Sequence, residues 1–165
     1  MKQLILVRHA KSSWKHDVID HERPLKNRGF NDAEIVSNYL KNSALNVDLV
    51  LSSDAMRAKT TAGIFISNLE FNEEIFNLNH DLYDFSGENL VKTIKQCDDK
   101  ITNLMVFGHN HAITAFVNTF GNTYINNVPT SGVVVIEFKI NSWKNLNKGK
   151  TTKISESHLM AGFVK

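Results

Sequence analysis

The sequence lacks the features that mark secreted, membrane-spanning or nucleic-acid-binding proteins. Its single cysteine, Cys97, excludes an intramolecular disulfide and suits a reducing compartment. No apolar stretch approaches the roughly 20 residues of a membrane span, and early charged residues interrupt any signal-peptide pattern. The 19 basic and 17 acidic side chains give a net charge of +2, which offers no electrostatic reason to expect a nucleic acid or membrane partner. We therefore expect a cytoplasmic protein.

Internal repeats, low-complexity tracts and interdomain linkers are also missing. The chain has 165 residues, of which 42% are hydrophobic and 22% are charged. This is the composition of an ordinary globular protein, and the length is enough to bury a substantial core. We expect one domain that spans residues 1–165.

What the sequence does contain is an alternation of short aliphatic runs and helix-like periodicity. Strands are predicted at residues 4–7, 47–51, 75–78, 104–107, 133–138 and 154–159. Helical faces are predicted at residues 30–40, 58–69, 87–101 and 113–120. The order predicts an α/β three-layer sandwich, with a mostly parallel central sheet and helices on both of its faces. The last two strands lack a helix between them, which predicts an antiparallel C-terminal edge.

The expected helix ends rest on particular residues. Pro24 could open the first helix, because proline is tolerated in the first turn. Ser52, Ser53 and Asp54 are expected to cap the second helix, and Gly121 to end the fourth.

Polar side chains follow three of the predicted strands. The first strand ends at Arg8 and His9, the second runs into the Ser-Ser-Asp stretch, and the fourth is followed by His109. Arg57 lies about one turn into the second helix, where its side chain leans back toward the helix N-terminus. Because the carboxyl ends of parallel strands share one edge, we expect these residues to form one site there.

Two arginines, two histidines and a helix N-terminus are well suited to a phosphoryl group. Guanidinium forks bind its oxygens in pairs, and the positive charges stabilise the negative charge of the transition state.

The same residues carry a resemblance to a known family. LVRHA at residues 6–10, SSDAMRAKTTA at 52–62 and FGHNH at 107–111 look like the signature blocks of the histidine phosphatase superfamily. HERPLKNRG at 21–29 and NVPTSGVVVIEF at 127–138 are similar to segments of its short SixA-like branch, the phosphohistidine phosphatases. The resemblance therefore spans nearly the whole chain.

This resemblance implies roles for four residues. His9 would be the nucleophile that becomes phosphorylated, and Arg8, Arg57 and His109 would complete the phosphate pocket. Neutral His9 would attack phosphorus while the two arginines and a protonated His109 hold the equatorial oxygens. Water would then release phosphate. Inorganic phosphate or sulfate should compete for the same cations.

Three further residues are candidates with open alternatives. Arg23 either adds a third guanidinium to the site or is simply exposed to solvent. Ser13, like its neighbour Ser12, either bonds His9 or phosphate or satisfies its own backbone. Asp84 resembles the position of the superfamily's general acid, with Glu88 as a second choice, but an aspartate there could equally cap the next helix.

No metal or other cofactor is expected. His111 follows His109 at a spacing that suggests metal binding, yet no second cluster of ligands is evident from the sequence. The remaining histidines lie among polar neighbours and are interpreted as surface residues: His16, His21, His80 and His158.

Three functions are compatible with these residues. The first is removal of phosphate from phosphohistidine in a protein partner, which a weak general acid and a shallow pocket would favour. The second is hydrolysis of small phosphomonoesters, for which a deep pocket containing Asp84 would be expected. The third is a non-catalytic module that binds phosphate or a phosphoprotein.

Overall fold

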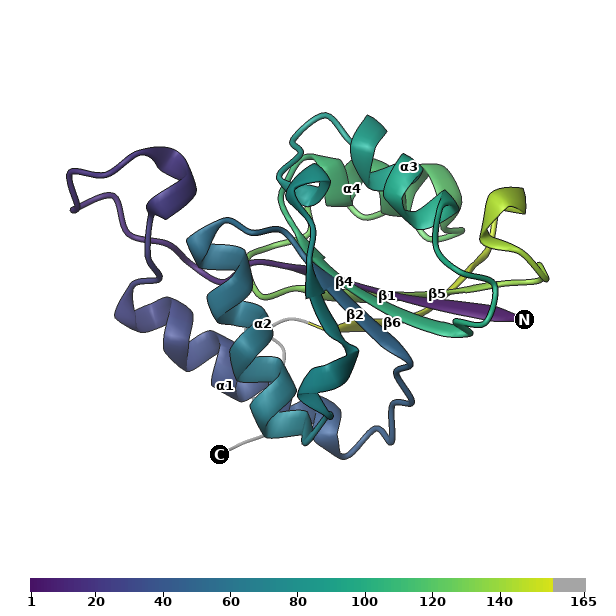
Figure 1. Ribbon diagram of the computed structural model, residues 1–165, viewed down its shortest axis with the longest axis horizontal. Helices are drawn as coiled ribbons and strands as arrows, with labels where there is room; N and C mark the ends of the chain where they lie inside the picture. Colours follow the sequence, from purple (N-terminus) through teal and green to yellow (C-terminus); the bar gives the residue numbers. More distant parts are fainter. Residues whose placement is uncertain (156–165) are drawn as a thin grey trace.

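The computed structural model describes residues 1–155, which form an α/β sandwich around one six-stranded sheet (Figure 1). The strand order across the sheet is β3-β2-β4-β1-β5-β6. The strands are β1 (Lys2–Arg8), β2 (Leu49–Ser52), β3 (Phe76–Leu78), β4 (Asn103–Gly108), β5 (Val133–Phe138) and β6 (Lys150–Ser155). Strands β1 to β4 run parallel to one another, whereas β5 pairs antiparallel with both β1 and β6. The predicted sheet with an antiparallel C-terminal edge is confirmed.

Helices cover both faces of the sheet (Figure 1). The helices are α1 (Asn27–Lys41), α2 (Met56–Leu69), α3 (Glu88–Lys95) and α4 (Ala112–Phe120), with short 3₁₀ turns η1 (Asp20–Glu22), η2 (Glu73–Ile75), η3 (His80–Leu82) and η4 (Trp143–Asn145). Helices α1 and α2 lie on one face, and α3 and α4 on the other. No helix in residues 1–155 has the length and apolar character that crossing a bilayer requires.

Each helix pair packs against the sheet through its own hydrophobic core. Within β1, Leu4 and Leu6 belong to the core under α3 and α4, whereas Ile5 and Val7 belong to the core under α1 and α2. Side chains alternate between the faces of a strand, so an unbroken aliphatic run is what a strand buried on both faces needs. All four side chains are fully buried, and this central strand is thereby held rigidly up to the residues that follow it.

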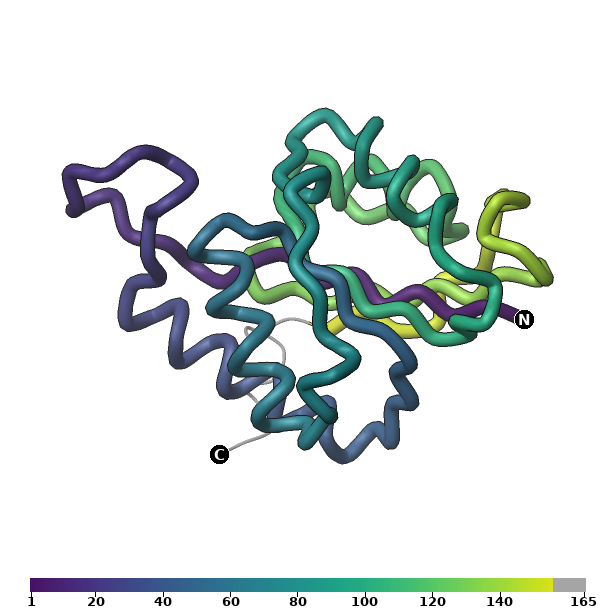
Figure 2. Tube along the Cα trace, viewed as in Figure 1, coloured from purple at the N-terminus to yellow at the C-terminus, as the bar shows by residue number. Residues whose placement is uncertain are grey.

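The first helix begins later than its proline suggested. Helix α1 starts at Asn27 instead of Pro24, because residues 24–26 pair with residues 11–13, which follow β1. The Ser13 amide donates to the Pro24 carbonyl, and the Lys26 amide donates to the Lys11 carbonyl. These bonds close the base of the segment between β1 and α1, which projects from the body of the molecule (Figure 2).

The cap of the second helix also differs from the expectation. Ala55 occupies the N-cap position of α2 and makes no side-chain capping bond. Ser53 Oγ accepts the Ala55 amide instead, and Asp54 turns outward to two histidines. The polar residues of this turn therefore serve tertiary contacts.

Two other predicted bounds were wrong. Helix α3 ends at Lys95 rather than Ile101, because Asp98 Oδ1 accepts the Lys100 amide and so offers the backbone a turn in place of a helix. The last strand begins at Lys150, four residues before the predicted start at residue 154, and is described as far as Ser155. The remainder of the predicted 154–159 strand lies outside the described residues.

Candidate active site

The carboxyl ends of β1, β2 and β4 meet at one edge of the sheet. Arg8 stands directly opposite Gly108 in the β1–β4 ladder, and the His9 amide donates to the Gly108 carbonyl. On the other side of β4, the Ser53 amide donates to the Phe107 carbonyl. The residues after these strands are therefore neighbours, and the imidazole rings of His9 and His109 lie 5.1 Å apart between centroids.

The His9 side chain is buried and held in one orientation. Its Nδ1 lies 2.7 Å from the Ala10 carbonyl oxygen, and a carbonyl can only accept, so Nδ1 carries the proton. The other ring nitrogen, Nε2, then keeps its lone pair. Burial is the main cause that lowers the pKa of His9 to about 3; the Ala10 bond raises the pKa, and the nearby Arg57 and Arg8 lower it. His9 is therefore neutral at neutral pH, as a nucleophile must be.

His109 is fully buried, and its Nε2 lies 2.8 Å from Ser53 Oγ. Burial lowers the pKa of His109 to about 2, and the neighbouring His9 and Arg57 act in the same direction. The expectation of a protonated His109 is wrong for the unliganded pocket, because too many cations and too little water surround the ring. A neutral imidazole can still donate one hydrogen bond to a phosphoryl oxygen.

Arg8 and Arg57 extend from β1 and α2 and are each fixed by bonds at the ends of their side chains. Arg8 Nη1 donates to the Val128 carbonyl at 2.9 Å, and Arg57 binds Asp20 through both terminal nitrogens. Their Nε atoms are buried without a hydrogen-bond partner within residues 1–155, as is Nδ1 of His109. Buried donors are normally satisfied, so these atoms are consistent with an anion site.

Arg23 joins the same cluster and is not the solvent-exposed arginine of the alternative interpretation. Its side chain is buried, and it binds Asp20 Oδ1 at 3.0 Å, the Ser13 carbonyl at 3.1 Å and Ser12 Oγ. The guanidinium also lies over the indole of Trp14, 3.3 Å from the ring centroid. These contacts fold the 11–24 segment toward the site.

Asp20 is the main residue that sequence reasoning missed. Its carboxylate accepts from Arg57, Arg23 and the Tyr83 hydroxyl, the last at 2.5 Å. Burial alone would raise the pKa of Asp20, but these hydrogen bonds hold it well below its usual value. Asp20 therefore stays ionised and orients two guanidinium groups. Its position within DHERPL, three residues before Arg23, was the available signal, since i,i+3 neighbours share one side of a helical turn.

Two aromatic residues next to Asp84 were also missed. Tyr83 packs edge-on against His109 with centroids 5.4 Å apart, and Phe85 lies 5.2 Å from the same ring. Phe85 is 47% exposed. The two rings help to keep water from His109, and Phe85 provides apolar surface at the rim of the site.

The two weakest candidates have local roles in the structure. Ser13 Oγ accepts the Lys15 amide, which is the backbone-satisfying alternative. The Asp84 carboxylate accepts four hydrogen bonds, from the amides of Ser86, Gly87 and Leu90 and from the Ser86 hydroxyl. Asp84 thus shapes the start of α3, in agreement with its capping alternative.

The prediction that His80 is a surface residue is confirmed, since its side chain is 72% exposed, whereas that of His21 is partly buried at 30% exposed. Both imidazoles bind the Asp54 carboxylate, with His21 Nε2 at 2.8 Å from Oδ1 and His80 Nδ1 at 2.9 Å from Oδ2. The prediction that no such cluster exists failed because the three residues are distant in sequence: the fold places His80 beside Asp54, and the 11–24 segment brings His21 to the same carboxylate.

Comparison with known proteins agrees with this geometry. The pattern of the "Histidine phosphatase superfamily (branch 1)" matches residues 4–82. The uncharacterized protein ML1117 of Mycobacterium leprae is 28% identical over 156 residues, which cover 85% of this chain and 91% of that protein.

Solved structures share the fold over nearly the whole chain. The SixA protein of Agrobacterium tumefaciens gives a TM-score of 0.79 at 22% identity and covers 93% of this chain and 97% of its own. The protein histidine phosphatase SixA in complex with tungstate gives 0.81 at 16% identity and covers 95% and 98%. The chain is therefore similar to the histidine phosphatase superfamily over residues 4–82 and shares the fold of the SixA proteins.

Proposed function

We propose that the protein is a phosphatase that uses His9 as its nucleophile and removes phosphate from phosphohistidine in a protein partner. The orientation of His9 carries this proposal. Because Nδ1–H donates to the Ala10 carbonyl, the lone pair is on Nε2 of a neutral ring, beside two fixed guanidinium groups. This is the arrangement that nucleophilic attack on phosphorus needs.

The reaction has two steps in this proposal. Nε2 of His9 attacks phosphorus while Arg8, Arg57 and the N–H of His109 bind the equatorial oxygens. The bond from phosphorus to the leaving nitrogen breaks, its electron pair stays on the substrate imidazole, and that nitrogen takes a proton from water. A second water then attacks the phosphoryl group on His9 and gives its surplus proton to the hydroxide left by the first, which releases inorganic phosphate and regenerates the free imidazole.

The state of the nearby carboxylates favours phosphohistidine as the substrate. Asp20 is held ionised by Arg57, Arg23 and Tyr83, and Asp84 accepts four hydrogen bonds from its own loop. Neither is arranged to protonate an alkoxide leaving group. Imidazole is a better leaving group than an alkoxide and needs less proton assistance, so phosphohistidine suits a site with these carboxylates.

We further propose that the chemistry needs no metal ion, because the arginines supply the positive charge that a metal would otherwise provide. The buried side chains of Arg57 and Arg23 and the half-buried Arg8 all lie near His9. Turnover should therefore persist after exhaustive treatment with a chelator.

The experiment is a comparison of substrates with matched variants. A protein phosphorylated on histidine is incubated with the wild-type chain, with His9→Ala, and with His16→Ala as a control at an exposed histidine of the 11–24 segment. We expect phosphate release by the wild type and the control, and an acid-labile phosphoenzyme on rapid quenching. Undiminished release by His9→Ala would overturn the proposal. Turnover of sugar or nucleotide phosphates without turnover of phosphohistidine would instead establish the phosphomonoester alternative.

A further inference from the structure

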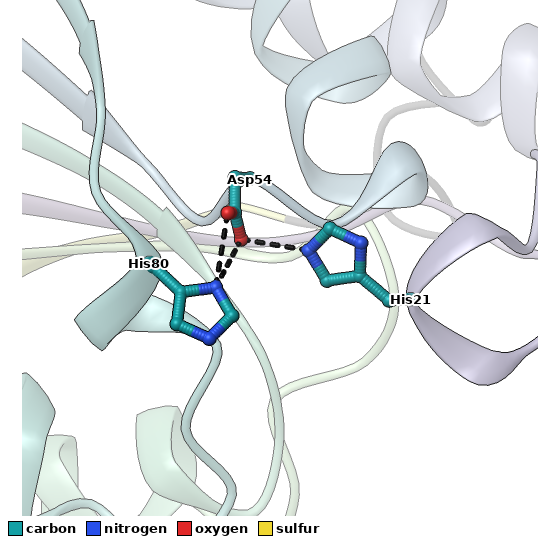
Figure 3. Close-up of side chains that lie close together, drawn as sticks. All are labelled: His21, Asp54 and His80. Atoms are coloured by element: carbon teal, nitrogen blue, oxygen red, sulfur yellow. Dashed lines mark hydrogen bonds and ion pairs between the residues drawn. The ribbon is translucent and has the colours of Figure 1, made fainter.

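We propose that His21, Asp54 and His80 bind one divalent transition-metal ion of the zinc type, which fastens the 11–24 segment beside the phosphate pocket. The three side chains come from η1, from the β2–α2 turn and from η3, and both rings point at one carboxylate (Figure 3). This site is separate from the phosphate pocket, and the proposal is independent of the function proposed above.

The geometry is close to that of a metal centre. One ligand atom from each of the three residues lies within 4.8 Å of the other two. Ligand atoms about 2.0–2.1 Å from a tetrahedral zinc ion are roughly 3.3 Å from one another. The present nitrogen-to-oxygen distances of 2.8 and 2.9 Å would therefore widen by about half an ångström, and the two imidazole nitrogens, which lie within 4.8 Å of each other, would approach by up to about 1.5 Å.

The donor set indicates which ion would bind. Two imidazoles and one carboxylate suit zinc and its first-row neighbours, whereas magnesium and calcium prefer oxygen donors alone. The His21 and Asp54 side chains are each 30% exposed and that of His80 is 72% exposed, so solvent can reach the remaining coordination positions. On binding, each imidazole would carry its proton on the ring nitrogen away from the metal.

The consequence for the fold follows from what surrounds the cluster. His21 follows Asp20, which binds Arg57 through its carbonyl and its carboxylate. The Tyr83 ring packs against His21, with centroids 4.9 Å apart, and its hydroxyl bonds Asp20. An ion that joins His21 to Asp54 would therefore hold η1, and with it Asp20, against the phosphate-binding arginine.

The test is a titration of the full chain, stripped of metal, with Co²⁺ and then with Zn²⁺. Tetrahedral Co²⁺ gives a visible absorption band that reports its ligands. We expect one Co²⁺ per chain, displaced by one Zn²⁺, and a rise in Tm with Zn²⁺. Loss of an outer hydrogen-bond partner costs a metal site roughly 10- to 100-fold in affinity. His80→Ala and Asp54→Asn each remove a ligand, so each should weaken binding by at least that much. His80 is exposed, so its variant should fold normally.

Two controls locate the ion. Binding should be unchanged in His16→Ala, an exposed histidine of the same segment, and in His9→Ala, which removes a histidine of the phosphate pocket. Absence of one-to-one binding by the wild type would overturn the proposal. The proposal would also be overturned if His80→Ala and Asp54→Asn bound the ion as tightly as the wild type, or if His9→Ala lost binding.

Limited proteolysis tests whether the ion holds the 11–24 segment in place. Trypsin can cleave after the exposed Lys15 in the 11–24 segment. We expect Zn²⁺ to slow this cleavage in the wild type and to leave it unchanged in His80→Ala. Equal cleavage rates with and without saturating Zn²⁺ in the wild type would show that the segment is not fastened.

Discussion

Two pairs of histidines lie in neighbouring regions of this protein, and their surroundings give them opposite chemistry. His9 and His109 are buried among arginines, and their pKa values are lowered to about 3 and about 2. His21 and His80 lie nearer the surface and share the carboxylate of Asp54. Burial and the nearby cations keep the first pair neutral in a pocket that suits an anion, whereas the carboxylate between the second pair suits a cation. The neighbouring residues therefore decide the role of each histidine.

The largest expected effect comes from removing the nucleophile of the buried pair. His9→Ala should lower turnover by about 10³-fold or more and abolish the phosphoenzyme, because the variant lacks the imidazole that becomes phosphorylated in our proposal. Rapid-quench labelling and steady-state kinetics measure both. A phosphoenzyme that persists in this variant would assign the nucleophile to another residue, and circular dichroism checks that the fold is retained.

The second largest effect is expected at Arg57, whose planar guanidinium forms paired hydrogen bonds. The His21–Asp54–His80 cluster has no such group. Arg57→Lys keeps the charge but loses the paired bonds to Asp20 and, in our proposal, to phosphate. We expect kcat/KM to fall by about 10²-fold, similar to the loss of one donor to a transition-state oxygen. Arg28→Lys is the matched control, because the Arg28 side chain is 74% exposed and its ion pair with Asp32 lies at the surface. Equal kcat/KM values for the two variants would show that Arg57 does not contribute to the reaction.

The third prediction concerns pH and separates the two regions by titration. The folded pKa values of His9 and His109 lie below the ordinary value of 6.5, so between pH 6.5 and 3 the unfolded chain binds protons that the folded chain does not. Stability therefore falls as the pH falls through this window, by up to about 1.4 kcal/mol per pH unit for each histidine.

Asp54 behaves differently. Burial would raise its pKa, but His21 and His80 lower it below 3.8, so its contribution to stability is present above that value and is lost only at more acidic pH.

The measurement is urea unfolding of the wild type and of His9→Gln at pH 7.5 and 5.5. The free energy of unfolding of the wild type should fall by about 1–3 kcal/mol between the two pH values, and His9→Gln should reduce this loss by about half. An identical loss in this variant would contradict the lowered pKa of His9.

How far the sequence predicts this site depends on the kind of backbone that carries each residue. Arg8, His9 and His109 follow buried strands, whose aliphatic runs are easily recognised and whose parallel order brings their ends together. Asp20 and His21 lie in an irregular segment without periodicity. Their partners Tyr83 and Asp54 are 63 and 33 residues away in sequence, so only the fold places them. The Ser-Ser-Asp stretch was expected to cap α2 because capping is a local rule, and the long-range contacts of Ser53 and Asp54 override it.

The smallest effect on turnover is expected at Asp84, and it decides the nature of the leaving group. Because the carboxylate accepts four hydrogen bonds from residues 86–90, Asp84→Asn should destabilise the fold by about 1–3 kcal/mol. It should change turnover of phosphohistidine by less than about threefold, whereas loss of a true general acid costs about 10²–10⁴-fold. Unfolding curves and kinetics on the same preparation separate the two readouts, with Glu88→Gln at the exposed start of α3 as control. A large kinetic loss without destabilisation would make Asp84 the proton donor and favour an alkoxide leaving group over imidazole.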